Sequence, residues 1–523
     1  MTDSTPDFVQ DSAESSERDS HPPRMQHALL ASVFIIASCG LAYELVAAAL
    51  ASYLLGDSIT QFSTVIGAYL FAMGIGSWLS RYVEGNLVRR FVQIELAVGV
   101  FGGFTAVALF LAFAAQMGPF RGLLYLAVLV VGVLVGLEIP LVMRILKREV
   151  TFRDLVSQVL AVDYLGALAV SLLFPLLLAP YLGLMRTGLL FGLLNVGVAV
   201  YALFLFRAQL THSGVLRLFA GACFLLLAGG LAVAGKVSDM AESWLYADEV
   251  IHMESSPYQR IVITRWRDDV RLFLNQNLQF SSKDEYRYHE ALVHPGLAAL
   301  PEARRVLVLG GGDGFAVREI LRYPRIQSLV LVDLDPAMTR LFSTAPLLTR
   351  LNDHALKDAR VTIVNDDAAR WLEEHADVFD FVVADFPDPA NFALGKLYST
   401  SFYRLLARHL APDGRIAVQS TSPYYARRSF WTIVATLEAV GLKTAPYHAL
   451  VPSFGEWGYV LAGREAPVMP AAYPEGLRFL TVAGTQDLFH FPADMARLPA
   501  KPNRLNEQGL VRLFEQEWQG VSH

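Results

Sequence analysis

The stretch that most constrains the fold is residues 305–336, RVLVLGGGDGFAVREILRYPRIQSLVLVDLDP. An apolar run meets a glycine cluster that includes Gly310 and Gly312, a helical pattern follows, and a second apolar run ends on Asp333. This order is typical of a nucleotide-binding βαβ unit, because glycine lets the backbone turn tightly and approach a ligand closely. An acid about 20 residues beyond the glycines can hold both hydroxyls of a ribose. The alternative is an ordinary tight turn in another kind of α/β domain.

Acidic side chains follow four successive strands of the expected sheet. They are Asp313 inside the glycine cluster, Asp333, the pair Asp366 and Asp367, and the pair Asp385 and Asp388. A carboxylate inside the cluster is a poor neighbour for a phosphate or a carboxylate of a ligand, but a good one for an amine. Helix N-capping can explain Asp367 or Asp388, but not the whole set. The set predicts a ligand that is cationic, rich in hydrogen-bond donors, or both.

Each acid can be given a physical role. Asp333 suits the ribose, and Asp367 can accept a hydrogen bond from an exocyclic amine such as that of adenine. Asp385 can take a proton from an amine nucleophile, because a carboxylate in a partly desolvated, acid-rich site has a raised pKa and is a stronger base. Asp313 and Asp388 can hold ammonium groups. The ligand that these residues describe is an adenosine carrying a cationic chain.

The surrounding sequence reads as a soluble α/β region. Residues 249–282 alternate apolar and polar side chains and contain turn candidates at 256–257 and 268–269, which favours a small antiparallel sheet. A helix is expected at 283–293. Beyond the glycine stretch, strands are expected near 361–364, 379–384, 414–420 and 442–447, and helices near 368–374, 399–409 and 427–440. Such alternation predicts one α/β domain over residues 283–465, with a mostly parallel sheet that binds ligands at the carboxyl ends of its strands. Residues 466–523 form an extension without an assigned role.

The first half of the chain is far more apolar. Hydrophobic residues make up 54% of the 523 residues although charged residues still reach 18%, so the apolar residues must be concentrated in one region. Within residues 27–236 we expect a membrane domain of seven helices, each near the ~20 residues needed to cross a bilayer. The segments are 28–49, 59–79, 91–114, 122–143, 159–181, 185–206 and 214–235. Residues 1–26 are polar and without periodicity, which predicts a disordered tail.

Ionisable residues interrupt these apolar segments. Glu44, Glu95, Glu138 and Asp163 lie within them, and charges at membrane depth by default mark a pathway or a functional pairing. The alternative, held equally, places these acids near helix ends or beside arginine partners. The glycine spacings 99–103 and 132–136 favour close helix packing rather than chemistry.

The basic residues create a conflict over orientation. The loops after the second and fourth segments are rich in arginine and lysine: Arg81, Arg89, Arg90, Arg144, Lys147, Arg148 and Arg153. The opposite loops carry little more than Arg121 and Arg186. By the positive-inside rule the first set faces the cytoplasm, and an odd number of spans then puts the C-terminal half outside. A domain that consumes a nucleoside metabolite is nevertheless expected in the cytoplasm, and a miscounted span is the favoured resolution.

Composition also excludes several classes of partner. The net charge of −6 is spread without a basic stripe, which argues against nucleic acid. Cys39 and Cys223 lie in apolar runs and indicate neither a zinc site nor a disulfide framework. The run HEALVH places His289 and His294 five residues apart rather than four, so they do not share a helix face as metal ligands do. No metal is expected.

Several stretches, in their order, resemble the polyamine aminopropyltransferases, the spermidine synthase family. They are SPYQ (256–259), LQFSSKDEYRYHEALVHPGL (278–297), VLVLGGGDG (306–314), VDLDP (332–336), NDDA (365–368), DFPDP (385–389) and VPSFGEW (451–457). The fusion to apolar segments resembles the membrane-anchored bacterial branch of that family. The resemblance implies a multi-span α-helical membrane domain in the cell membrane, a small antiparallel β domain, and a Rossmann-like domain of the S-adenosylmethionine methyltransferase type. A homodimer is the assembly expected.

The resemblance also implies roles for individual residues. Decarboxylated S-adenosylmethionine is expected as a co-substrate, with no tightly bound cofactor, and would be held by Gln259, Gln279, His289, Gly310, Gly312, Asp313, Asp333, Asp366 and Asp367. Asp385 would deprotonate the attacking amine. The acceptor site would be lined by Tyr288, Asp388, Phe454 and Glu456. Displacement of methylthioadenosine by the amine needs alignment and proton removal but no metal.

Two departures from the family pattern fall on the acceptor side. Phe386 and Pro387 stand between the two acids of DFPDP, where the family has small hydroxyl residues, and the following ANFALGKLY also differs. Phe454 stands where a tyrosine is usual, and the stretch before Glu456 is shortened. Putrescine, giving spermidine, is therefore an expectation that rests on the family alone.

Two other functions compete with this reading. An S-adenosylmethionine-dependent methyltransferase shares the fold, the glycine loop and the ribose acid, but Asp313 and the Tyr288–Glu290 stretch disfavour it. In the second, the C-terminal domain senses polyamines or nucleosides for a transporter made of the apolar helices. A plausible base at Asp385 argues against this sensor.

Overall fold

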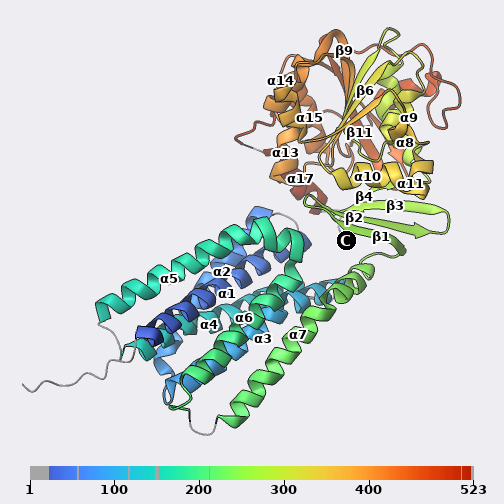
Figure 1. Cartoon of the computed structure of the whole chain (residues 1–523). Helices are drawn as coiled ribbons and strands as arrows, with labels where there is room; N and C mark the ends of the chain where they lie inside the picture. Colours follow the sequence, from blue (N-terminus) through green and yellow to red (C-terminus); the bar gives the residue numbers. More distant parts are fainter. Residues whose placement is uncertain are drawn as a thin grey trace, which may run out of the picture. The chain divides into compact units, whose positions relative to one another are not determined.

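The computed structural model describes residues 23–55, 58–115, 118–147, 152–210, 213–507 and 509–519. The chain divides into two compact units, residues 1–242 and 243–523 (Figure 1). Most of the tail expected at residues 1–26 lies outside the described residues, and the first helix begins at Pro23.

Helices make up the first unit. They are α1 (Pro23–Leu55), α2 (Ser58–Leu79), α3 (Leu87–Ala114), α4 (Phe120–Leu146), α5 (Phe152–Leu173), α6 (Leu184–Leu205) and α7 (Gly214–Ser243), with a short 3-10 turn η1 (Ser80–Tyr82) after α2. The described residues thus contain seven helices long and apolar enough to cross a membrane, as the sequence predicts. The count gives no support to a miscounted span, so the conflict over orientation is not removed.

The fifth apolar helix changes its winding near its end. Helix α5 continues into a π-helix, η2 (Phe174–Leu182), which contains Pro175 and Pro180. Proline has no amide hydrogen and its ring clashes with the preceding turn, so regular α-helical bonding is interrupted at such positions. Gly183 then ends the segment with a φ of +78°, in the left-handed region.

Glycines bring the helices of this unit into close contact, as their spacing predicts. A Cβ on Gly136 of α4 would lie 2.2 Å from the carbonyl oxygen of Met73 on α2. A Cβ on Gly192 of α6 would lie 2.6 Å from the carbonyl oxygen of Gly99 on α3. Backbones that approach this closely exclude any larger side chain at these positions.

The second unit begins with a four-stranded antiparallel sheet in the order β1-β2-β3-β4. The strands are β1 (Glu249–Ser255), β2 (Arg260–Trp266), β3 (Asp269–Leu274) and β4 (Asn277–Ser281). Asn275 and Gln276 connect β3 to β4 with φ values of +49° and +70°. Two successive positive φ values are typical of the tight hairpin turn whose twist matches that of its strands. The antiparallel sheet expected over residues 249–282 is thus present.

A seven-stranded sheet follows in the order β10-β11-β9-β8-β5-β6-β7. Its strands are β5 (Arg305–Gly310), β6 (Ser328–Asp333), β7 (Val361–Asn365), β8 (Phe379–Asp385), β9 (Leu410–Gln419), β10 (Lys443–Val451) and β11 (Gly455–Gly463). Strands β5 to β9 pair in parallel, whereas β11 is antiparallel to both β9 and β10. The mostly parallel sheet is confirmed, although strand β11 was not expected.

Helices connect the strands of this sheet (Figure 1). They are α8 (Glu285–Leu297), α9 (Phe315–Leu321), α10 (Pro336–Thr344), α11 (Pro346–Leu351), η3 (Ala355–Lys357), α12 (Ala368–Glu374), α13 (Phe392–Gly395), η4 (Lys396–Tyr398), α14 (Thr400–Arg408) and α15 (Arg427–Glu438). The buried strand residues alternate between two apolar clusters. Val306 and Val308 of β5 belong to one, with α8, α9 and α10, whereas Leu307 and Leu309 belong to the other, with α12, α14 and α15. Both faces of the sheet are therefore covered, as a parallel sheet requires.

The C-terminal extension packs against this domain. It contains α16 (Val482–Thr485), η5 (Gln486–Phe489) and α17 (Gly509–Gln519). The buried carboxylate of Glu290 accepts hydrogen bonds of 2.8–3.0 Å from three successive backbone amides, at residues 478–480. The indole of Trp431 donates to the carbonyl of Met495, on the face covered by α15. These contacts give the extension its place in the unit.

Candidate active site

In the large sheet the chain adds β6 and β7 on one side of β5 and then returns to add β8 on the other side. The strand order therefore reverses between β5 and β8. Ligands bind open α/β sheets at such a switch point, beyond the carboxyl ends of the strands. Gly310 ends β5 beside Asp385, the last residue of β8. Its φ is +79°, and a Cβ there would lie 2.2 Å from the carbonyl oxygen of Asp385. Only glycine allows this approach, as the sequence predicts.

Asp333 at the end of β6 supports the glycine loop. Its Oδ2 accepts a 3.0 Å hydrogen bond from the amide of Gly312, and its Oδ1 accepts one of 2.9 Å from the amide of Asp335. A Cβ on Gly312 would lie 2.7 Å from Oδ2 of Asp333. Burial raises the pKa of Asp333 to about 6. Each carboxylate oxygen keeps a second lone pair, so the group can still accept from a ligand diol.

Asp313 lies between the loop and helix α9. Its Oδ1 accepts a 3.0 Å bond from the amide of Phe315, and its backbone carbonyl accepts one of 2.8 Å from the side chain of Asn352. Burial raises its pKa to about 6, the nearby His289 opposes this, and the charge of Asp385 adds to it. The acids expected from the first and fourth strands therefore lie within electrostatic reach of each other.

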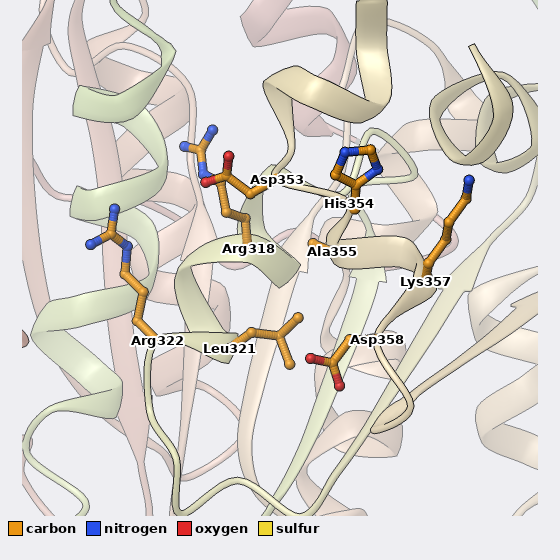
Figure 2. Close-up of a pocket in the computed structure, with 8 residues that line it drawn as sticks. All are labelled: Arg318, Leu321, Arg322, Asp353, His354, Ala355, Lys357 and Asp358. Atoms are coloured by element: carbon orange, nitrogen blue, oxygen red, sulfur yellow. The ribbon is translucent and has the colours of Figure 1, made fainter. Parts of the chain in front are cut away.

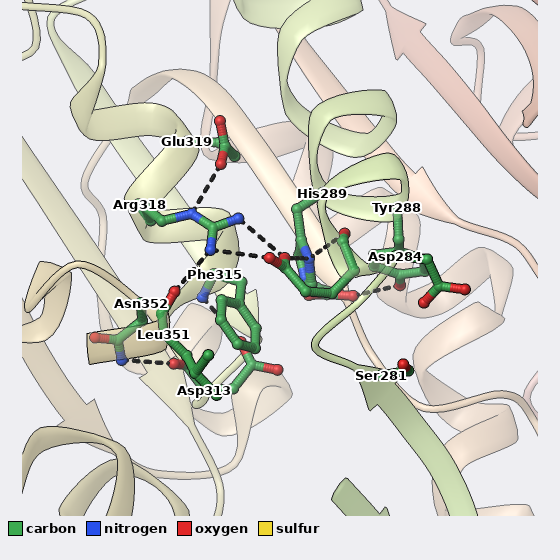
Figure 3. Close-up of polar contacts among 12 residues, drawn as sticks. Ser281, Asp284, Tyr288, His289, Asp313, Phe315, Arg318, Glu319, Leu351 and Asn352 are labelled. Carbon is green, nitrogen blue, oxygen red and sulfur yellow. Dashed lines mark hydrogen bonds and ion pairs between the residues drawn. The ribbon is translucent and has the colours of Figure 1, made fainter. Parts of the chain in front are cut away.

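His289 on α8 is held by a chain of charged groups (Figure 3). Its Nδ1 lies 2.9 Å from Oε2 of Glu285, whose two oxygens accept bonds of 2.9 and 3.0 Å from the guanidinium of Arg318. Arg318 also donates to Glu319 at 2.8 Å. Burial lowers the pKa of His289, but Glu285 outweighs this and raises it above the usual value. The ring is thereby fixed in orientation.

The strongest candidate for a base is Asp385. Its Oδ1 accepts a 2.6 Å hydrogen bond from the hydroxyl of Tyr288 on α8. Burial raises the pKa of Asp385, while His289 and the bond from Tyr288 lower it. The ring of Tyr288 packs against Tyr459 at 5.6 Å and Phe454 at 6.3 Å between ring centres. A partly buried carboxylate with a tyrosine donor and aromatic neighbours can accept a proton from an amine.

Asp388 sits in a separate polar group. Its oxygens accept bonds of 3.1 Å each from the amide of Gln419 and the hydroxyl of Thr421, at the end of β9. Burial raises its pKa to about 6. Thr421 has a φ of +56°, a strained conformation that is often found at functional sites. Sequence reasoning missed Gln419 and Thr421, although Gln419 ends the parallel strand β9 and Thr421 follows it, which is the signal that identified the acids.

The two unusual residues between the acids serve the hydrophobic core. Phe386 is 7% exposed and packs on Phe402 at 5.6 Å between ring centres. The carbonyls of Phe386 and Pro387 accept bonds from the hydroxyl of Tyr398 at 3.2 and 3.1 Å. The loop that carries both acids is thus fixed by groups on α14 and η4.

Asp366 and Asp367, the acids after β7, already have local partners, which supports the helix-capping alternative for Asp367. Asp367 caps α12 through bonds of 2.9 and 3.2 Å to the amides of Ala369 and Arg370, and Lys396 lies 2.7 Å from its other oxygen. Burial raises the pKa of Asp367, but Lys396 outweighs this and lowers it below the usual value. Asp366 accepts from the amide of Asp367 at 2.8 Å.

The two glutamines expected at the co-substrate have different surroundings. The amide of Gln259 donates to Asp335 at 2.9 Å, and Ser256 donates to the same oxygen at 2.7 Å. Asp335 also caps helix α10, so Gln259 ties the turn after β1 to the large sheet. The amide of Gln279 on β4 donates to the nearby carbonyls of Asn277 and Leu278, at 3.2 and 3.4 Å.

The residues expected at the acceptor side are only partly together. Phe454 lies beside Tyr288, as noted above, and its ring centre is 5.2 Å from that of Trp457. Glu456 instead pairs with His448 at 2.9 Å across the β10–β11 hairpin. Sequence reasoning missed His448, because only the β10–β11 pairing, which sets Leu450 opposite Glu456 and His448 opposite Gly458, brings the imidazole within reach of the glutamate.

A pocket of about 550 Å³ lies between α9 and η3 (Figure 2). Among its lining residues, Arg318 and Arg322 both bind Glu319, and Asp358 binds Arg360. Because these charges are already neutralised, the pocket offers less for a charged ligand than the strand ends do. His289 and His294, the pair in the HEALVH run, bind Glu285 and Glu319 respectively and do not converge.

Comparison with known proteins bears on this site. A family model described as the spermine/spermidine synthase domain matches residues 285–468. A polyamine aminopropyltransferase 2 of Ralstonia nicotianae is 59% identical over 94% of this chain and 98% of that protein. A polyamine aminopropyltransferase of Leptospira interrogans is 50% identical over 95% of this chain and 100% of that protein. A solved structure of spermidine synthase with the transition-state analogue AdoDATO aligns with a TM-score of 0.44 at 24% identity, over 47% of this chain and 86% of that one.

Proposed function

This chain belongs to the polyamine aminopropyltransferase family, and we propose that it transfers the aminopropyl group of decarboxylated S-adenosylmethionine to putrescine. The products of this reaction are spermidine and methylthioadenosine. Aminopropyl transfer is the activity of the family, whereas the co-substrate, the acceptor and the residue roles are the parts that we propose. The observation that carries the proposal is the partly buried Tyr288–Asp385 hydrogen bond beside the glycine loop.

Asp385 acts as the base in this mechanism. An amine reaches the site as an ammonium ion and cannot attack until it loses a proton, which the Asp385 carboxylate accepts. The freed nitrogen lone pair then forms a bond to the aminopropyl carbon, and the carbon–sulfur bond breaks with its electron pair going to sulfur. The sulfonium becomes a neutral thioether, and the new secondary amine carries the positive charge. The raised pKa of Asp385 makes it a stronger base than an exposed aspartate.

The glycine-loop side holds the co-substrate. Asp333 accepts from the ribose hydroxyls through the lone pairs that the backbone amides leave free. Asp313 holds the ammonium of the aminopropyl chain, and its charge repels the carboxylate of ordinary S-adenosylmethionine. His289 is oriented by Glu285 and contributes a fixed polar edge beside Asp313. Because the co-substrate is consumed, the reaction requires no resident cofactor.

The β9 side holds the far end of the acceptor. Among the described residues, Asp388 accepts from the neutral donors Gln419 and Thr421, so it can take the second ammonium of a diamine. Tyr288 and Phe454 supply an aromatic wall for the methylene chain between the two nitrogens. A diamine has one ammonium group for Asp385 and a second for Asp388, and we therefore favour putrescine.

The first unit is proposed to anchor the enzyme in the cell membrane. Its seven apolar helices favour the lipid bilayer as a partner, and the homodimer considered above stays a prediction. We place the second unit in the cytoplasm because its nucleoside co-substrate is an intracellular metabolite. Fusions of green fluorescent protein and of alkaline phosphatase to the C-terminus test this: fluorescence without phosphatase activity is expected. The reverse pattern would show that the positive-inside rule holds and the location is wrong.

The reaction is tested on the full-length protein in detergent or lipid. Decarboxylated S-adenosylmethionine is supplied with putrescine, cadaverine, agmatine or spermidine, and methylthioadenosine and the amine product are followed by mass spectrometry. Putrescine should give the largest kcat/KM. A parallel reaction with ordinary S-adenosylmethionine should give no methylated amine, since methyl transfer would support the rival methyltransferase.

Two variants make this experiment decisive. Asp385→Asn keeps the shape of the side chain but removes the base, and should lower kcat by about 10²–10⁴-fold. Asp487→Asn, at an exposed position in the extension, is the matched control and should leave kcat unchanged. Tight co-substrate binding without product from any amine would favour the sensor and reject the transferase mechanism.

A further inference from the structure

The first unit contains a buried polar cluster that aminopropyl transfer does not use. Glu95 of α3, Glu138 of α4 and Asn195 of α6 are each 0% exposed. The amide nitrogen of Asn195 donates to Oε2 of Glu95 at 3.1 Å and to Oε1 of Glu138 at 3.4 Å. One neutral amide therefore joins two carboxyl groups from different helices, in the interior of an apolar bundle.

The remaining oxygens of the cluster have no partner. Oε1 of Glu95, Oε2 of Glu138 and Oδ1 of Asn195 are buried without a hydrogen bond from any described residue. A buried oxygen that lacks a donor is costly, and two carboxylates in one dry site cannot both stay charged. Three buried oxygens can therefore still accept a hydrogen bond, in apolar surroundings that tolerate negative charge poorly.

A fourth helix contributes another buried polar group to this cluster, the hydroxyl of Tyr43. Tyr43 of α1 is 3% exposed, and its hydroxyl also lacks a partner among the described residues. Its ring lies on Gly102 of α3, where a Cβ would be 2.7 Å from the ring carbon that carries the hydroxyl. The hydroxyl interacts electrostatically with both Glu138 and Glu95. It can donate to a carboxylate or accept from a carboxylic acid.

The arginine-pairing alternative from the sequence does not apply to this pair. In the described parts of the chain, neither Glu95 nor Glu138 forms an ion pair with a lysine, arginine or histidine. Several other titratable groups lie on the helices packed around the cluster: Cys39 and Glu44 on α1, Tyr69 on α2 and Asp163 on α5. Tyr69 and Cys39 already donate to the carbonyls of Gly40 and Phe191. Asp163 is only half-buried and interacts electrostatically with Glu138.

We propose that Glu95 and Glu138, with Asn195 and Tyr43, form a proton-binding site in the membrane unit. The pair holds one proton: one carboxyl is neutral and the other is charged. The proton enters and leaves as H⁺ by way of Asp163, which is the least buried of the acids named above and interacts electrostatically with Glu138. A proton fits the observations better than a larger cation, because it needs no space and satisfies two buried oxygens at once. The site goes beyond aminopropyl transfer and does not depend on its mechanism.

Carbodiimide labelling tests the site directly. The full chain is reconstituted in phospholipid nanodiscs and treated with dicyclohexylcarbodiimide, which reacts with protonated carboxyl groups in apolar surroundings. Labelled peptides are quantified by mass spectrometry over a pH series. Labelling at Glu95 or Glu138 should fall roughly tenfold per pH unit above its midpoint, as loss of a single proton requires. Labelling at neither residue at any pH, or at a constant rate over the whole series, would overturn the proposal in favour of a fixed structural clamp.

Conservative variants separate the pair from its surroundings. In Glu95→Gln the remaining Glu138 loses a negatively charged neighbour and gives up its proton more easily. Labelling of Glu138 should therefore occur only at lower pH than in the unaltered protein. Glu138→Gln should have the same effect on the labelling of Glu95. Glu84→Gln, at an exposed position of the same unit, is the matched control and should change nothing. Aminopropyl transfer and thermal unfolding confirm that each variant folds. If a variant does not fold, the pH series on the unaltered protein still decides.

The occupant is tested in the same assay. At fixed pH and ionic strength, neither putrescine nor sodium chloride should slow the labelling of Glu95 or Glu138 appreciably, and the two should give the same labelling rate. Strong protection by putrescine alone would identify an ammonium group as the occupant and overturn the proton assignment. Strong protection by sodium would do the same for a metal cation.

Discussion

The hydroxyl of Tyr288 donates a 2.6 Å hydrogen bond to Oδ1 of Asp385, joining α8 to the end of β8 across 97 positions of the chain. The bond stabilises the charged carboxylate and so opposes the effect of burial on its pKa. A carboxylate whose pKa depends on this bond therefore lies at the switch point of the sheet. The strength of this bond should therefore control the pH at which the enzyme becomes active.

Replacing Tyr288 with phenylalanine removes the bond and keeps the ring. The pKa of Asp385 should then rise, so the carboxylate form, and with it kcat/KM, should be lost at a higher pH than in the unaltered enzyme. The acid limb of the pH–rate profile is the measurement. Tyr403→Phe is the matched control, because Tyr403 is buried and its hydroxyl has no partner among the described residues. An acid limb that does not move would remove Tyr288 from the mechanism.

Gly310→Ala should destabilise the second unit by about 2–4 kcal/mol, because the new Cβ meets backbone that cannot move away. The new methyl carbon would lie 2.2 Å from the carbonyl oxygen of Asp385. In addition, residue 310 has a φ of +79°, which alanine adopts only with strain. Gly441→Ala isolates the cost of the backbone angle, since Gly441 has φ +89° and no atom within 4 Å. Thermal unfolding of both variants gives the comparison. Equal losses would mean that the close approach to Asp385 relaxes at no cost.

The raised pKa values of Asp313 and Asp333, each to about 6, predict a pH-dependent stability. When folding raises the pKa of a carboxyl group, the folded state binds the proton more tightly than the unfolded state does. The resulting stabilisation is complete at a pH below the unfolded-state pKa and is lost as the pH rises through the folded-state pKa. Without ligand, the enzyme should therefore become more stable as pH falls from about 6 toward about 4. Co-substrate binding should weaken over the same interval. Calorimetry and unfolding in the same buffers test both, and Asp313→Asn should flatten the binding profile.

Asp313→Asn should also relax selectivity between the two forms of S-adenosylmethionine. Removing the charge abolishes repulsion of the extra carboxylate and weakens the hold on the ammonium of the aminopropyl chain. Inhibition by ordinary S-adenosylmethionine should strengthen about tenfold relative to co-substrate binding, which corresponds to about 1.4 kcal/mol. If the ratio of the two dissociation constants is unchanged, Asp313 does not contact the chain.

Gln419 should act on the acceptor without touching the co-substrate. Its amide donates to Asp388 at 3.1 Å and to the carbonyl of Phe386 at 2.6 Å. Gln419→Leu should raise the KM for putrescine about tenfold, because Asp388 loses a donor and its loop loses an anchor. The KM for the co-substrate should stay the same. Gln327→Leu, at an exposed position, controls for the loss of an amide, and a parallel rise in both KM values would point to a general loss of structure.

The residues that apolar patterns alone identified share one property: each lies at or just after the end of a strand, whereas Tyr288 and His289 on α8 came from the family resemblance. Gly310, Asp313, Asp333 and Asp385 could be found because a glycine turn or an acid after an apolar run needs no knowledge of distant partners. Gln419 and His448 could not be found in this way. Their roles depend on Asp388 and Glu456, which are brought near by a sheet crossover and by a hairpin register. Asp367 shows the converse, because a local helix cap and Lys396 already occupy a carboxylate that the pattern assigned to a ligand.

The sequence by itself determined the division into an apolar helical region and an α/β region, the glycine loop, and the acids at the strand ends. These depend on hydrophobic periodicity and on backbone freedom, both of which act over a few neighbouring residues. Only the tertiary structure decided which carboxylates are buried together, which already have partners, and which side chains from distant segments complete the site. The pKa of Asp385 depends on how far it is removed from water and on the hydroxyl of Tyr288, and both are set by packing across the whole sheet.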